Sequence, residues 1–156
     1  MSILQNTCFG PYYFQVAIIL RNTILANGIL TNSEAWYGLN DSDLKILEGV
    51  DEQLLRRVLE VPSTCPKEML YLEMGCVPFK YIVASRRLNC LHYILNEDES
   101  SLIHQVLKSQ SEQPLKDDWY LSLVKNLEEF QLDMNFEEIK QLSSFSFHTI
   151  VQKSVC

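Results

Sequence analysis

Apolar residues recur every three or four positions through most of this chain, and this spacing most strongly constrains its fold. The clearest example spans residues 40–60, with apolar residues at Leu44, Leu47, Val50, Leu54, Leu55 and Val58. Steps of three and four place these side chains on one face of an α-helix. We expect Asn40 or Asp41 to cap its start and Pro62 to end it.

Proline and glycine separate the other periodic segments. Pro66 suits a first helical position and Gly75 the left-handed position after a helix end, which predicts a short helix over residues 66–74. Pro78 opens the next helix, which we expect to run to about Asn96. Further helical patterns occupy residues 14–30, 100–109, 117–131, a short stretch from 135, and 144–155. The predicted fold is all-α, a compact array of seven or eight helices without a substantial sheet.

The sequence contains no recognisable motif for catalysis, nucleotide binding or metal binding. Its three histidines are scattered, and its cysteines are widely spaced: Cys8, Cys65, Cys76, Cys90 and Cys156. This spacing predicts buried free thiols in a reducing compartment rather than disulfides or a zinc site. We interpret the adjacent Asp117 and Asp118 as a helix start rather than a metal pair. We therefore expect no enzyme activity and no cofactor.

Residues 1–10 are not typical of a signal peptide, and the apolar stretch 14–30 is not typical of a membrane-spanning helix. Residues 1–10 contain no basic residue, and the apolar stretch 14–30 is interrupted by Gln15, Arg21, Asn22 and Asn27. Signal peptides begin with basic residues, and spanning helices need about 20 apolar residues. We expect an intracellular protein, cytoplasmic or nuclear, that does not bind membranes.

The net charge of −7 is distributed unevenly. Residues 1–60 contain four basic and seven acidic residues, residues 61–96 four basic and two acidic, and residues 97–156 five basic and eleven acidic. The middle segment is therefore +2, while the last is −6. Strong autonomous binding to nucleic acid is disfavoured by the overall acidity, since nucleic-acid binders usually carry a basic surface.

One arginine of the basic segment falls in an unusual position on a helical wheel. Arg86 lies inside an apolar stripe and Arg87 on its flank, whereas the polar arc consists of Tyr81, Ser85, Asn89 and His92. An arginine among apolar side chains needs a partner. We expect Arg86 either to pair with Glu68 or Glu73 of the preceding short helix or to contact a phosphate.

A second arginine pair ends the helix predicted over residues 40–60. Glu52 precedes Arg56 by four residues, which favours a surface ion pair. The alternative is that Arg56 and Arg57 together form a phosphate clamp at the helix end.

Several linked motifs occur in order. Residues 29–37 read ILTNSEAWY, and residues 50–59 read VDEQLLRRVL. A proline-flanked segment follows with PKEMLYLE at 66–73, then RRLNCLHYIL at 86–95. The first motif is similar to the LLYGSEAW stretch downstream of the catalytic aspartates in non-LTR (LINE-type) retrotransposon reverse transcriptases. Residues 15–96 carry the strongest match, and the C-terminal third resembles the acidic helical extension of the same lineage.

The resemblance implies a thumb-like helical region over residues 1–96, with an acidic extension over 97–156 packed on it. In that family the thumb cradles the template–primer duplex. The aromatic-x-Asp-Asp motif of the palm is missing, so the resemblance implies a noncatalytic fragment. Weak binding to an RNA–DNA hybrid or to RNA would then involve Arg21, Arg56, Arg57, Lys80, Arg86 and Arg87.

A second interpretation is a helical protein-interaction module without a nucleic-acid role. Its motivation is the acidic charge, which repels a phosphate backbone. An exposed apolar surface would then bind a protein partner or a second copy of the chain.

Overall fold

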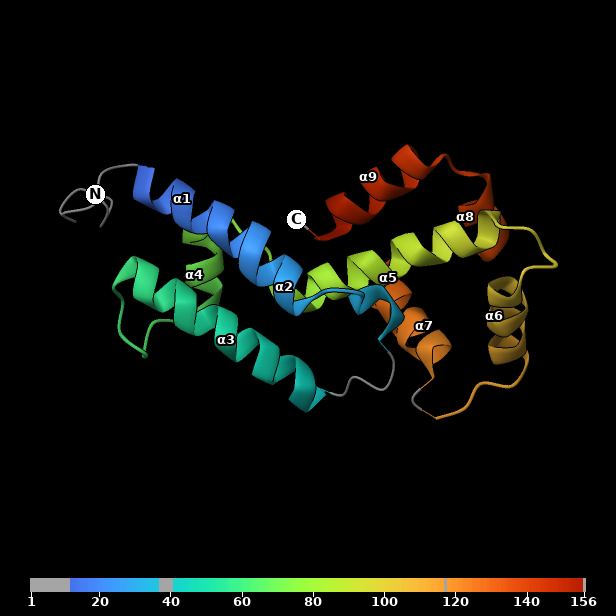
Figure 1. Ribbon diagram of the computed structural model, residues 1–156, viewed down its shortest axis with the longest axis horizontal. Coiled ribbons are helices and arrows are strands. Elements are labelled where there is room, and N and C mark those ends of the chain that lie inside the picture. The colour runs from blue at the N-terminus through green and yellow to red at the C-terminus, as the bar shows by residue number, and fades with distance from the viewer. Residues whose placement is uncertain (1–11, 37–40, 117, 156) are drawn as a thin grey trace.

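The computed structural model describes residues 12–36, 41–116 and 118–155, and these residues form helices and no strand (Figure 1). This confirms the all-α prediction. The predicted capping residue Asn40, together with Asp117, Cys8 and Cys156, lies outside the described residues. In chain order the helical elements are α1 (Tyr12–Leu20), η2 (Arg21–Ala26), α2 (Asn27–Ile29), η3 (Ser33–Ala35), α3 (Asp41–Leu59), α4 (Lys67–Met74), α5 (Phe79–Asn96), α6 (Leu102–Glu112), α7 (Trp119–Glu129), α8 (Phe136–Gln141) and α9 (Ser144–Val155).

Helix ends in the middle of the chain follow the proline and glycine signals. Pro66 and Pro78 stand one residue before α4 and α5, so Pro66 precedes the first helical position rather than occupying it. Gly75 ends α4 with a φ of 59°, a left-handed conformation that glycine adopts without steric cost. Asn135 and Glu138 form a reciprocal capping box at the start of α8.

The apolar run 14–30 forms one nearly continuous helical rod, the N-terminal rod, made of α1, η2 and α2. Its middle element, η2, is a π-helix. A π-helical turn is wider than an α-helical one because its hydrogen bonds join residues five apart. The sequence pattern predicted a helix here but not this change of pitch.

Helix α5 lies at the centre of the array, between the N-terminal helices and α6 to α9 (Figure 1). The predicted polar arc is wrong for Ser85 and His92, which are buried. His92 Nε2 lies 2.9 Å from the carbonyl oxygen of Leu142, and its ring stacks on Phe147 with centroids 5.2 Å apart. Because neighbours cover α5 on more than one face, a single apolar stripe does not describe it.

Three groups of buried side chains hold the helices together. The largest joins α5 to α6, α7, α8 and α9 through residues such as Leu88, Leu91, Leu123, Ile139 and Phe147. A second joins α3 and α4 to α1, and a third joins the rod to the start of α5. The C-terminal helices therefore pack directly on α5, while the division at residue 96 stays a prediction. None of the helices in the described part of the chain is long and apolar enough to cross a bilayer.

Two phenylalanines of α9 test the largest core. Phe147 is 1% exposed within it, whereas Phe145 is 81% exposed. We predict that Phe147→Ala lowers the free energy of unfolding by about 3–5 kcal/mol, because it removes buried surface and leaves a cavity. Phe145→Ala should change it by less than about 0.5 kcal/mol. Urea denaturation followed by circular dichroism measures both, and equal effects would contradict the packing of α9 on α5.

Candidate functional site

Arg21 forms a buried ion pair rather than a surface contact. It is 2% exposed, and Asp51 of α3 is 0% exposed. The Arg21 Nε donates to Asp51 Oδ1 at 2.7 Å, and Nη2 pairs with Oδ2 of the same carboxylate. Two parallel bonds of this kind are the strongest arginine–carboxylate geometry. The pair fastens the π-helical segment of the rod to the middle of α3.

Further contacts complete the surroundings of Arg21. Nη2 also donates to the carbonyl oxygen of Val77 at 2.8 Å, and the guanidinium carbon lies 4.9 Å from the ring centroid of Phe79. Burial alone lowers the pKa of Arg21, but the hydrogen bonds and charge of Asp51 outweigh it and the pKa is raised. Since its charge is neutralised inside the protein, Arg21 is not placed to contact a phosphate.

The two arginines at the end of α3 have different environments. Arg56 Nη1 donates to the carbonyl oxygens of Pro62 at 3.0 Å and Cys65 at 2.8 Å, so it closes the loop that follows α3. It does not make the predicted pair with Glu52, and the phosphate clamp stays a prediction. Arg57 is exposed, and the described residues provide no hydrogen bond or ion pair for it.

Arg86 is held by the N-terminal rod, and the predicted pair with Glu68 or Glu73 is wrong. Its Nη2 donates to Asn27 Oδ1 at 2.8 Å, and its Nη1 donates to the carbonyl oxygen of Leu30. Helix α4 packs against α3, which leaves both glutamates exposed to solvent. Arg86 therefore binds the carbonyl end of the rod, where positive charge is favoured.

Arg87 and Lys80 line the side of α5 that faces α7. Arg87 is 5% exposed and donates to Asn126 Oδ1 at 2.7 Å and to the carbonyl oxygen of Trp36 at 3.0 Å. Lys80 Nζ lies 3.6 Å from Glu129 Oε1 and 4.4 Å from the ring centroid of Tyr81. The six predicted cations are thus spread over the molecule and do not form one basic surface.

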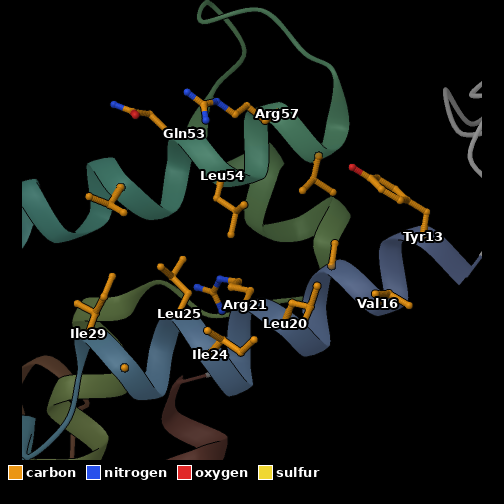
Figure 2. A pocket seen from close by; sticks show the side chains of 14 residues that line it. Tyr13, Val16, Leu20, Arg21, Ile24, Leu25, Ile29, Gln53, Leu54 and Arg57 are labelled. Atoms are coloured by element: carbon orange, nitrogen blue, oxygen red, sulfur yellow. The ribbon is translucent and has the colours of Figure 1, made fainter.

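An apolar groove lies between the N-terminal rod and α3, with a volume of about 680 Å³. Figure 2 shows Leu54 of α3 pointing toward the rod, with Gln53 and Arg57 along the outer side of α3. Val16, Leu20 and Ile24 of the rod line the groove and remain exposed. A contiguous exposed apolar surface of this kind is typical of a contact with another macromolecule.

Two polar groups, Tyr71 and Cys76, lie close to the Arg21–Asp51 pair. Burial, and then the charge of Asp51, raises the pKa of the Tyr71 phenol, and burial also raises the pKa of the Cys76 thiol. Both groups therefore stay protonated at neutral pH. Cys65, Cys76 and Cys90 are unpaired and half-buried, and no group of side chains in the described part of the chain could hold a metal ion.

The Arg21–Asp51 pair was not among the predicted contacts, although the sequence contains a signal for it. Asp51 stands four residues after Leu47 and four before Leu55, on the apolar face of α3. A carboxylate on such a face needs a cation, and Arg21 stands likewise within an apolar run. The groove could not be found this way, because it depends on how two helices separate.

Comparisons with protein-family models, with curated proteins and with solved structures found no match for this chain.

We predict that Asp51→Ala lowers the free energy of unfolding by about 3–5 kcal/mol, because it leaves the Arg21 guanidinium charged, buried and unpaired. The neighbouring Glu52→Ala, at a half-buried position, is the matched control and should cost less than about 1 kcal/mol. Chemical denaturation of both variants measures the difference. A small effect of Asp51→Ala would show that the buried pair does not form.

Proposed function

We propose that the chain is a noncatalytic helical region of a retrotransposon reverse transcriptase, resembling the thumb that cradles a template–primer duplex. The observation that carries this proposal is the set of motifs in residues 29–37, 50–59, 66–73 and 86–95, which occur in the expected order. An all-α fold is consistent with it.

Contacts between the motifs support a single unit. Arg87 donates to the carbonyl oxygen of Trp36, and Arg86 donates to that of Leu30, so the last motif binds the first. Trp119 Nε1 also donates to the carbonyl oxygen of Glu34, at 2.6 Å. Residues 50 and more apart in sequence thus depend on each other, which gives the motif residues a shared structural role.

The nucleic-acid contact in this proposal is weak and centres on Arg57. Arg21 is neutralised by Asp51, and Arg56 and Arg86 bind backbone carbonyls. Arg57 is exposed at the end of α3, with no partner among the described residues. Lys80, which is paired with Glu129, contributes less because an ion pair partly cancels its charge.

We predict that a short RNA–DNA hybrid binds weakly at low salt and that the logarithm of the binding constant falls linearly with the logarithm of the salt concentration. Arg57→Ala should reduce the size of this slope by about 1, the value for one lost phosphate contact. Fluorescence anisotropy of a labelled hybrid measures both quantities.

The control for this experiment is Lys108→Ala, which removes an exposed charge from α6 in the acidic C-terminal part. It should leave the slope unchanged. Absence of binding at low salt, or equal slopes for all three proteins, would reject the nucleic-acid part of the proposal.

The apolar groove favours a second candidate function, a protein-interaction module that pairs with another copy of the chain. Its exposed apolar residues, Val16, Leu20 and Ile24, would be covered in such a pair. Two copies each carry a net charge of −7, so burial of these apolar residues has to outweigh the repulsion between the copies.

Two isoleucines with the same exposed fraction test this second candidate. Ile24 lines the groove and Ile46 lies outside it on α3, and each is 67% exposed. We predict that Ile24→Asp weakens self-association at least about tenfold, because burying a carboxylate in an apolar contact is costly. Ile46→Asp should have no effect. Sedimentation velocity over a concentration series measures association, and a monomer at every concentration would reject this candidate.

A further inference from the structure

Arg87 is a buried cation without a counter-charge. It is 5% exposed, and its two hydrogen bonds go to neutral oxygens, the Asn126 amide and the Trp36 carbonyl. Its Nε is buried and has no hydrogen-bond partner. No carboxylate among the described residues pairs with it, in contrast to Arg21. Buried arginines are normally neutralised by an acidic side chain, so an anion from outside the protein would supply the counter-charge that Arg87 lacks.

Arg87 lines a pocket of about 230 Å³ between α5, α7 and the start of α3. Water occupies about 30 Å³ per molecule in the liquid, so the pocket has room for a tetrahedral oxyanion. Three of its lining residues are cationic, namely Lys80, Arg87 and Lys125, and one is acidic, Glu129. Ser122 adds a hydroxyl donor.

The neighbouring acid does not neutralise this pocket. Glu129 Oε1 lies 3.6 Å from Lys80 Nζ, so its charge is shared with that lysine. Burial lowers the pKa of Arg87, the direction expected for a cation that gains no nearby negative charge. An arginine remains protonated at neutral pH even so. The charge on the buried guanidinium is thus uncompensated by the protein.

We propose that this pocket binds a phosphate group, with the Arg87 guanidinium as the buried anchor and Lys125, Lys80 and Ser122 as further donors. A planar guanidinium suits phosphate because two N–H groups can reach two oxygens at once. The group could be supplied by inorganic phosphate or by the backbone of a nucleic acid. The site does not rest on the proposed function, because binding of inorganic phosphate requires no nucleic acid.

The experiment measures the thermal unfolding midpoint of the whole chain against inorganic phosphate, with chloride added to hold the ionic strength constant. A ligand that binds only the folded state raises the midpoint with its concentration. We expect phosphate to raise the unfolding midpoint where chloride does not.

Lys125→Ala should weaken the apparent affinity for phosphate about tenfold, because it removes a charged donor. Lys108→Ala, which removes a charge away from the pocket, should leave the affinity unchanged.

Arg87→Gln should abolish the response to phosphate. If that variant does not fold, Lys125→Ala and Ser122→Ala decide the result, since both residues lie at the pocket and leave the core cluster intact. A second arm replaces phosphate with a short RNA–DNA hybrid, and a Lys125-dependent rise there identifies the backbone as the source. A rise with phosphate alone identifies the free anion. No rise with either, or equal rises in the wild type and Lys125→Ala, would overturn the proposal.

Discussion

The N-terminal half of this molecule depends on one buried ion pair, Arg21 with Asp51. The pair joins the rod to α3. The hydrogen bond from Arg21 to the Val77 carbonyl also connects the rod to the segment just before α5. Breaking such a pair is costly, since the remaining charge would stay buried. Arg21 of this pair also forms part of the wall of the groove. The position of the exposed apolar surface is therefore set by an electrostatic contact rather than by apolar packing alone.

The sequence predicted helices well where local rules decide the structure. The apolar spacing of α3, Gly75 after α4 and Asn135 before α8 act within a few residues, and each helix formed where these signals place it. Such signals report backbone hydrogen bonding and one buried face, which are local quantities. They carry no information on helical pitch, so the sequence did not predict the π-helical turn in the rod.

Side-chain partners were harder to predict, because they depend on how helices assemble. Arg86 binds the rod, 56 residues away in sequence from Leu30, instead of a glutamate on the adjacent short helix. His92 is buried although a wheel places it with polar residues, because α9 covers that side of α5. For a central helix with neighbours on several sides, exposure is a property of the assembly. The candidate basic residues were consequently identified by charge alone, and most of them bind within the protein.

The wide turn η2 has a consequence for how related chains should be aligned. A π-helical turn holds about one residue more than an α-helical turn, and the helices on either side continue in the same direction. A homologue lacking one residue between positions 21 and 26 can run the rod as a plain α-helix and keep both flanking faces in register. A single-residue gap at this place therefore does not indicate a different fold.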